Sequence, residues 1–217
     1  MDLGAARDSE EARRLLSPAS PLRRRYKELA ANLAAEGGGA RSIVVTAPEP
    51  GAGCTSVCLG LGAALAASGR PAAVVDCNLG RPHLHRVVGG ANFVGLTSGL
   101  DGRRPLESYG REVLPGLLVV PTGPVTASPQ ALLEGEAVVE AVRGLEAGRE
   151  MVLLDAPVVG ELLGAPALLG GFDGILLVIH ASRTSRKAAR EATDDLIEAG
   201  ANLLGVVLNG AYGAHMS

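Results

Sequence analysis

The chain alternates between short, continuous apolar runs and longer segments with helical spacing of apolar residues. Six of the runs lack the polar alternation of a half-exposed strand, so they are typical of strands buried on both faces. Turn residues, mainly Gly and Pro, separate the runs from one another. The predicted strands are residues 43–46, 72–76, 117–120, 151–155, 175–179 and 203–208.

Helical segments are predicted between these strands, over residues 55–68, 128–145 and 186–199. Ser128 and Pro129 are typical of the N-cap and the first residue of a helix. Strands that alternate with helices predict an α/β fold, in which helices cover both faces of a mostly parallel central sheet. The Gly-rich and charged segment 89–116 is expected to form short helices and loops.

The first forty residues precede this alternating pattern. They are predicted to form an N-terminal arm and a helix from Pro21 to about Ala35, which three glycines at 37–39 end. A length of 217 residues is typical of one substantial domain. We therefore divide the chain into residues 1–40, the arm and helix, and residues 41–217, the α/β domain.

The segment between the first predicted strand and the next helix resembles a phosphate-binding loop. The Walker A pattern is Gly-x-x-x-x-Gly-Lys-Ser/Thr, and its backbone N–H groups hold phosphates at a helix N-terminus. Here the four fixed positions are Pro48, Gly53, Cys54 and Thr55, so a cysteine stands where the pattern has its lysine. The candidate cofactor-binding residues are Gly51, Ala52, Gly53, Cys54, Thr55, Ser56 and Asn209.

Polar residues end three of the predicted strands. Asp76 and Asp155 close two of them, and Asn209 follows the last. Ligands of open parallel sheets bind beyond the carboxyl ends of the strands, so we expect these side chains to lie near the loop. A carboxylate there is a suitable oxygen ligand for Mg²⁺, and Thr55 could supply another; Asn209 is a candidate contact for an adenine edge.

Together, these motifs resemble the bacterial tyrosine autokinases of capsule and exopolysaccharide synthesis (CpsD/CapB type), within the MinD/Mrp-like P-loop NTPases. The resemblance runs from about Arg25 to Gly210. It implies a three-layer α/β P-loop NTPase-like domain with a mostly parallel central sheet. The segments that carry the resemblance are 26–33, 46–56, 74–82, 95–100, 121–123, 128–133, 155–157, 172–174 and 205–209.

The resemblance also implies an activity and its cofactors. It implies an ATP-dependent protein-tyrosine kinase that uses Mg²⁺, with Asp76 and Asp155 as catalytic residues. Thr55, Asp76 and Asp155 would hold the metal. It implies a membrane chain-length or copolymerase adaptor protein as partner, a possible homo-oligomer, and association with the membrane through that partner. The cytoplasmic location that we expect rests on the sequence, which shows neither a secretory signal nor a membrane-spanning run.

The chain departs from this family where the chemistry takes place. Cys54 replaces the loop lysine, Asn78 replaces a second carboxylate, Gly164 another, and Ala156 stands where the family has threonine. Removing one preorganised transition-state donor slows chemistry by about 10²–10³-fold. We therefore expect a weakly active or inactive kinase, a pseudoenzyme that retains the fold.

Composition and charge further limit the partners and the location that we expect for the protein. The net charge is -3, which gives no support to a nucleic-acid partner. No apolar run approaches the length that spans a bilayer, and the start lacks the apolar core of a secretory signal. The three cysteines are too few for a disulfide framework, which agrees with a reducing compartment.

Two alternatives stay open from the sequence. Cys54, Cys58 and Cys77 could form a redox or metal site in a vacated nucleotide pocket, and a helix N-terminus would lower the pKa of the Cys54 thiol. The simpler interpretation is that Cys58 and Cys77 are small residues of the apolar core. The other function is a MinD/ParA-like positioning ATPase, which would need the loop lysine that this chain lacks.

Overall fold

A central sheet organises the computed structural model, which describes residues 3–100, 103–124 and 129–211. Within these ranges, seven strands form one sheet in the order β3-β4-β2-β5-β1-β6-β7. Neighbouring strands are parallel, except that β3 runs antiparallel to β4. The strands are β1 (Ser42–Thr46), β2 (Ala72–Asp76), β3 (Arg111–Leu114), β4 (Leu117–Val120), β5 (Met151–Asp155), β6 (Gly174–His180) and β7 (Leu203–Asn209).

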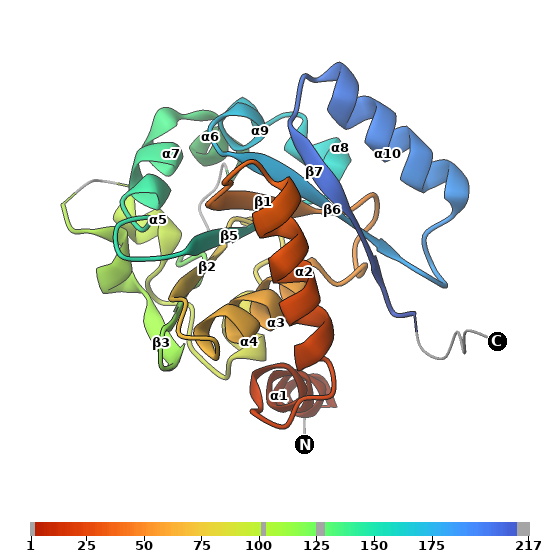
Figure 1. Ribbon diagram of the computed structural model, residues 1–217. Helices are drawn as coiled ribbons and strands as arrows, with labels where there is room; N and C mark the ends of the chain where they lie inside the picture. Colours follow the sequence, from red (N-terminus) through yellow and green to blue (C-terminus); the bar gives the residue numbers. More distant parts are fainter. Residues whose placement is uncertain (1–2, 101–102, 125–128, 212–217) are drawn as a thin grey trace.

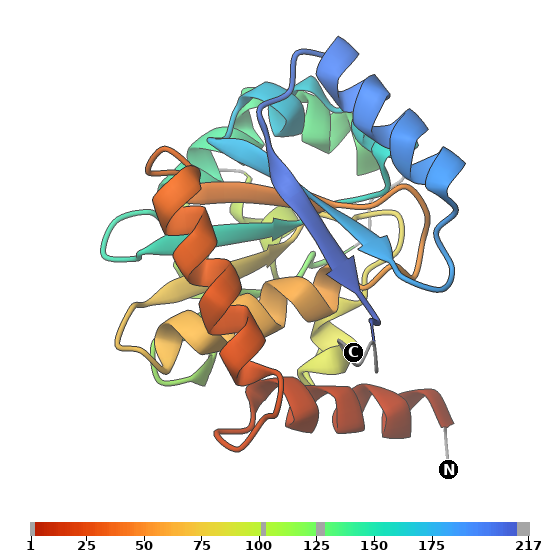
Figure 2. The same ribbon diagram turned by 45° about the vertical axis from the view of Figure 1, so that its right-hand side comes forward.

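Helices cover both faces of the sheet (Figures 1 and 2). One face carries α1 (Leu3–Leu16), α2 (Arg23–Glu36), α3 (Cys54–Ala66) and α4 (Leu84–Val87). The other face carries α5 (Leu96–Gly99), the 3-10 helix η1 (Leu106–Tyr109), α6 (Pro129–Glu134), α7 (Glu136–Arg143), α8 (Val159–Leu162), α9 (Pro166–Gly170) and α10 (Arg186–Glu198). The fold is therefore the predicted three-layer α/β arrangement.

Two apolar cores flank the sheet, because successive side chains of a strand point to opposite faces. In β1, Ile43 and Val45 pack in the core that contains α3, whereas Val44 packs in the core that contains α7 and α9. All three side chains are fully buried. This two-sided burial is the reason that β1 shows no polar alternation in the sequence.

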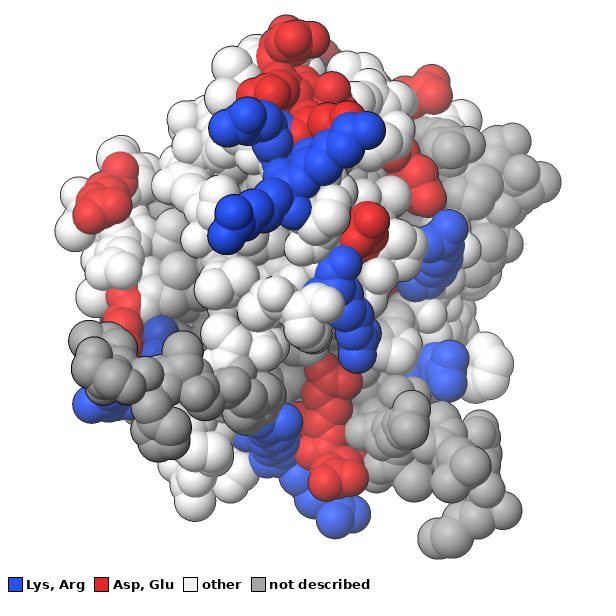
Figure 3. Space-filling view, turned by 90° about the vertical axis from the view of Figure 1, so that its right-hand side faces the viewer, with Lys and Arg blue, Asp and Glu red and all other residues white. Residues whose placement is uncertain are grey.

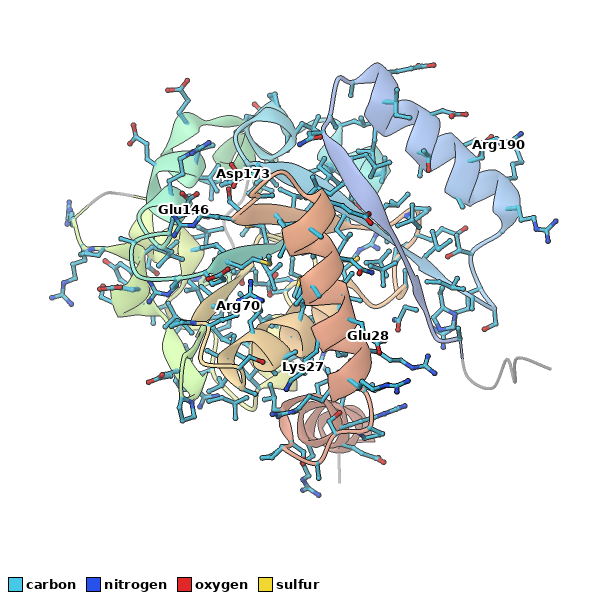
Figure 4. All side chains as sticks on the ribbon, in the orientation of Figure 1. Lys27, Glu28, Arg70, Glu146, Asp173 and Arg190 are labelled. Carbon is cyan, nitrogen blue, oxygen red and sulfur yellow. The ribbon has the colours of Figure 1, made fainter. Side chains whose placement is uncertain are left out.

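Polar contacts fix the amino-terminal edge of the sheet. The Asp173 carboxylate accepts hydrogen bonds from the backbone N–H groups of Arg41 (2.7 Å) and Ser42 (2.8 Å). The Arg41 guanidinium donates to the carbonyl of Glu146 at 2.6 Å. Figure 4 places Asp173 and Glu146 at this edge, which is the edge remote from the phosphate loop.

The N-terminal helices pack against α3. The ring of Tyr26 lies over Gly60, and its hydroxyl donates to the carbonyl of Ser56 at 3.2 Å. Burial raises the pKa of Tyr26 to about 12. Leu15 of α1 and Leu33 of α2 are buried in the same core. Residues 1–40 thus supply part of the packing around the phosphate loop.

The sequence predictions agree with most elements. All six predicted strands are confirmed to within two residues at either end. Three predictions were wrong in detail: the arm contains a helix, α1; segment 89–116 also contains β3; and Gly135 divides the helix expected over 128–145 into α6 and α7. Ser128, the predicted N-cap, lies outside the described residues.

Replacing Gly60 with alanine tests the packing of α2 on α3. A Cβ atom at Gly60 would lie 2.2 Å from the Tyr26 ring, so α2 must shift. We expect Gly60→Ala to lower the free energy of unfolding by about 1–3 kcal/mol, measured by urea denaturation. Gly160→Ala, a control in α8 where a Cβ would meet nothing within 4 Å, should not lower it and should raise it by up to about 1 kcal/mol, because alanine favours a helix over glycine. Equal stability of the two variants would contradict the packing.

Candidate functional site

A cavity of about 860 Å³ lies at the carboxyl edge of the sheet. Its walls come from the loop between β1 and α3, from the ends of β5, β6 and β7, and from the loop after β2. The predicted loop residues 51–56, Asp155 and Asn209 line it, whereas Asp76 lies behind the wall and does not. The volume is typical of pockets for small molecules and cofactors.

The backbone of the loop is shaped to bind an anion. Gly51 has φ +80° and Gly53 has φ +102°, values that residues with a Cβ rarely adopt. Gly53 is the N-cap of α3 and provides no side-chain hydrogen bond to the first turn. The N–H groups at the start of α3 are therefore directed at the cavity without a side-chain cap, as in anion-binding helix N-termini.

Asn209 holds this loop in place. Its Nδ2 donates a hydrogen bond to the carbonyl of Ala52 at 2.8 Å. A Cβ at Gly53 would lie 2.0 Å from the same Nδ2, so Gly53 is required both for its φ and for this close approach. The side chain predicted to contact an adenine edge thus also anchors the phosphate loop.

Thr55, Asp155 and Asp76 come together beside the loop. The Thr55 hydroxyl donates to Oδ2 of Asp155 at 2.5 Å, and Asp76 is the register partner of Asp155 across β2 and β5. Both carboxyls are buried. Burial raises the pKa of each above that of an exposed aspartate, and the charge of Asp76 raises the pKa of Asp155 further.

Asp76 also organises the loop that follows β2. Its carboxylate accepts backbone hydrogen bonds from Asn78 (3.1 Å), His83 (3.2 Å) and Leu84 (3.1 Å). The side-chain oxygen Oδ1 of Asn78 is buried at the cavity and has no hydrogen-bond partner among the described residues. A buried acceptor of this kind is rare unless a water, ion or ligand satisfies it.

These oxygen atoms fit a magnesium ion. Two carboxylates, a threonine hydroxyl and an unsatisfied amide oxygen are the donor types that Mg²⁺ accepts, and Mg²⁺ keeps several of its waters when one or two carboxylates bind it. Thr55, Asp76 and Asp155, the predicted metal residues, would hold the ion, which would neutralise the buried carboxylates.

The cysteines are not arranged as the metal site that the sequence left open as an alternative. Among the described residues, no group of three or more His, Cys, Asp or Glu side chains is placed to hold a metal ion. The expectation of a lowered thiol pKa was wrong. Burial raises the pKa of Cys54, and the Asp155 charge raises it further, so the thiol stays protonated. Cys58 and Cys77 are fully buried core residues.

Two side chains at the cavity were missed from the sequence. Glu11 of α1 accepts a hydrogen bond from the Ser56 hydroxyl. Arg183, in the loop after β6, donates from Nη1 to the carbonyl of Gly51 at 3.5 Å. Both reach the loop across long sequence separations, and the sequence pattern around them carries no signal of the contact.

The charged surface has no single sign on the face that Figure 3 shows. Lys and Arg side chains lie beside Asp and Glu side chains, including in the upper part of the view, where α10 lies. Within the described ranges, no helix has the length and apolar character needed to cross a bilayer.

The sheet, the loop and the carboxylates at the strand ends define a P-loop NTPase fold of the MinD-like type. Solved structures agree. The chimerical protein CapA2B2 matches with a TM-score of 0.83 and 24% identity over 93% of this chain and 90% of that chain. The BceF tyrosine kinase domain matches with a TM-score of 0.77 and 27% identity over 90% of this chain and 80% of that chain. A cobyrinic acid a,c-diamide synthase from Mycobacterium smegmatis, solved with an ATP analog and magnesium, shares the fold at a TM-score of 0.64, covering 77% of this chain and 70% of that chain at 18% identity.

The chain is similar in sequence to bacterial tyrosine kinases. EpsB of Ralstonia nicotianae is 31% identical over 199 residues, which is 91% of this chain. The tyrosine-protein kinase YwqD of Bacillus subtilis is 29% identical over 78% of this chain, and CpsD of Streptococcus agalactiae is 24% identical over 85%. No family model matches the chain. The chain spans 26% of the length of EpsB, 72% of YwqD and 80% of CpsD.

The buried carboxylates predict how stability depends on pH without added metal. The folded state retains their protons at a higher pH than the unfolded chain, whose aspartates titrate near pH 4. The free energy of unfolding should therefore fall as the pH rises from about 4 through about 8. Urea denaturation at a series of pH values measures this slope.

An amide at position 155 separates this effect from other titrations. Asp155→Asn cannot ionise, so its stability should depend less steeply on pH over the same range. Asp194→Asn, a control at an exposed position of α10, should keep the wild-type slope. Identical slopes for wild type and Asp155→Asn would show that the buried pair does not set the pH dependence.

Proposed function

We propose that this chain is a CpsD-like component of exopolysaccharide or capsule assembly that binds ATP and Mg²⁺ but transfers phosphate weakly or not at all. The observation that carries the proposal is the phosphate loop, whose backbone keeps the anion-binding shape although Cys54 stands at the lysine position. The tyrosine kinases YwqD and CpsD, which are similar in sequence, support tyrosine kinase as the class of activity, and we propose that this activity is weak or lost here.

Nucleotide binding is supported by the groups that do not depend on the lysine. The N–H groups at the start of α3 would receive phosphate oxygens. The hydroxyls of Thr55 and Ser56 donate to Asp155 and Glu11, so they would bind phosphate only after giving up those hydrogen bonds. Asn209 would lie against the base, since it lines the same cavity and its side-chain hydrogen bond to the loop uses only the amide nitrogen. Asp76 and Asp155 would hold Mg²⁺, which supplies charge neutralisation to the phosphates.

Weak phosphoryl transfer follows from the missing charge. Phosphoryl transfer relies on positioning and on cations that stabilise the charge of the transferring group. The Cys54 thiol is neutral, because burial raises its pKa, so it offers no charge at the loop. A hydrogen bond to a charged group contributes about 1.5–3 kcal/mol, and its loss in the transition state alone slows the reaction by about 10²-fold.

The partner and the location are proposals from the family resemblance. A membrane chain-length or copolymerase adaptor would recruit the chain to the cytoplasmic side of the membrane, and homo-oligomers would form there. The mixed charge of the face in Figure 3 supports a protein partner rather than a nucleic acid.

A positioning ATPase of the MinD type is the weaker alternative. The MinD ATPase of Pyrococcus furiosus matches with a TM-score of 0.63 over 78% of this chain, whereas the kinase domain of the Escherichia coli tyrosine kinase ETK matches with 0.81 over 92%. The tyrosine kinases also dominate the sequence relatives. The greater likeness to kinases therefore favours the polysaccharide role.

The activity is tested with purified protein and Mg²⁺-ATP. We expect tyrosine phosphorylation, of the chain itself or of an added peptide, to stay at least about 10²-fold below that of YwqD assayed in parallel. Phosphotyrosine immunodetection and release of inorganic phosphate measure it. Rapid ATP turnover that Asp76→Ala abolishes would contradict the pseudoenzyme proposal.

The cellular role is tested by complementation. Deletion of the gene in its bacterium should reduce the amount or the length of an exported polysaccharide. If the chain acts without phosphoryl transfer, Asp76→Asn should restore the polymer as well as wild type does, because the amide oxygen can still accept from His83 and Leu84, although the bond from Asn78 to the other oxygen is lost. Failure of Asp76→Asn to restore it, at equal protein level, would indicate that metal binding at Asp76 or phosphoryl transfer is required, and an unchanged polymer on deletion would exclude the role.

A further inference from the structure

We propose that Arg183 supplies the cation for the phosphates of a bound nucleotide, in place of the missing loop lysine. This inference rests on the proposed nucleotide binding and assigns a residue to it. Two observations support the inference. Arg183 Nη1 donates a hydrogen bond to the carbonyl of Gly51, and backbone contacts fix the loop in which Arg183 lies.

The guanidinium lies at the phosphate loop itself. Its Nη1 is 3.5 Å from the carbonyl oxygen of Gly51, and it would lie 3.7 Å from a Cβ built on that glycine. Gly51 is three residues before Cys54, in the part of the loop that curves over the start of α3. Arg183 also lines the same cavity as the residues of this loop. A phosphate bound on the loop would therefore be within reach of this side chain.

The backbone that carries Arg183 is held in place. The N–H groups of Arg183 (3.2 Å) and Thr184 (3.0 Å) donate to the carbonyl of His180, and Ala181 donates to the carbonyl of Asn209 at 2.8 Å. The Thr184 hydroxyl accepts from the backbone N–H of His180, and Ser185 caps α10 through the N–H of Ala188. The position of Arg183 is thus fixed relative to Asn209, which anchors the phosphate loop.

Most of the guanidinium is free to bind an anion. The side chain is exposed, and among the described residues its polar contact is the Gly51 carbonyl, with no ion pair to a carboxylate. A guanidinium has five N–H donors in a planar fork that matches phosphate oxygens. Arg81, another arginine that lines the cavity, is instead 3.6 Å from the Glu161 carboxylate. Arg183 therefore combines contact with the loop and capacity to bind a phosphate.

The charge around the loop favours a cation at its Gly51 side for phosphate binding. Asp155 and Glu11 bring carboxylates to the Thr55 and Ser56 side of the loop, and Cys54 is neutral. Mg²⁺ would offset the charge of the aspartates, but the opposite side of the loop, at Gly51, has only Arg183 as its side-chain partner among the described residues. A charged hydrogen bond there would replace part of the contribution of a lysine at position 54.

Calorimetric titration of the whole chain tests this assignment, with Mg²⁺-ADP, Mg²⁺-ATP and adenosine as ligands. We expect Arg183→Ala to weaken binding of both nucleotides by about tenfold or more and to leave adenosine binding unchanged. The matched control is Arg190→Ala, which removes the same charge from α10, where Figure 4 labels the side chain away from the phosphate loop. It should bind all three ligands as wild type does.

A second substitution makes the test specific for the missing lysine. Cys54→Lys in the Arg183→Ala background should restore nucleotide affinity. Arg183→Ala should also weaken binding less in the Cys54→Lys variant than in the wild-type chain, because the introduced ammonium supplies the same charge. Thermal unfolding checks that each variant is folded. Because the Arg183 side chain is exposed, we expect Arg183→Ala to fold as the wild type does.

Several outcomes would overturn the assignment. These are unchanged nucleotide affinity in Arg183→Ala, an equal loss in Arg190→Ala, an equal loss for adenosine, or a wild-type chain that binds neither nucleotide. The first three leave the proposed polysaccharide role intact, and the fourth removes nucleotide binding from it. In contrast, rapid ATP turnover would contradict the pseudoenzyme proposal without affecting the role of Arg183.

Discussion

The parallel pairing of β1, β5 and β6 is the constraint on which the site depends. Because these strands run in the same direction, Asp155 at the end of β5 lies opposite Val45, just before the chain enters the phosphate loop. The parallel pairing of β2 with β5 places Asp76 opposite Asp155, and the pairing of β6 with β7 places Asn209 opposite His180. A register shift of one residue would turn these side chains to the other face of the sheet and dismantle the site.

The two components of phosphate binding have different physical origins in this chain. The anion-binding backbone depends on the fold: Gly51 and Gly53 adopt left-handed conformations, and Asn209 fixes the loop. In the Walker A pattern, the positive charge comes from one lysine side chain. This chain has the uncharged Cys54 at that position. The left-handed glycines and the Asn209 hydrogen bond do not involve the side chain at position 54, so our proposal treats nucleotide binding and phosphoryl transfer as separable properties. Arg183 provides charge for the first without the placement that the second requires.

The sequence predicted the parts of the molecule that local pattern determines. Continuous apolar runs predicted the buried strands, and the aspartates that end two of them predicted the pair at positions 76 and 155, since parallel strands end at one edge. The contacts of Glu11 with Ser56 and of Arg183 with Gly51 join positions 45 and 132 residues apart, so they depend on how helices and loops pack. The thiol pKa of Cys54 was predicted with the wrong sign because burial outweighs the helix N-terminus.

A crystal structure of the chain with Mg²⁺-ADP tests the central claim most directly. The account predicts phosphate oxygens on the N–H groups at the start of α3, Mg²⁺ between the phosphates and the side chains of Thr55 and Asp155, and the Arg183 guanidinium within hydrogen-bond distance of a phosphate. A loop without nucleotide at saturating ligand, or phosphates that bind another basic side chain while Arg183 stays on Gly51, would contradict it.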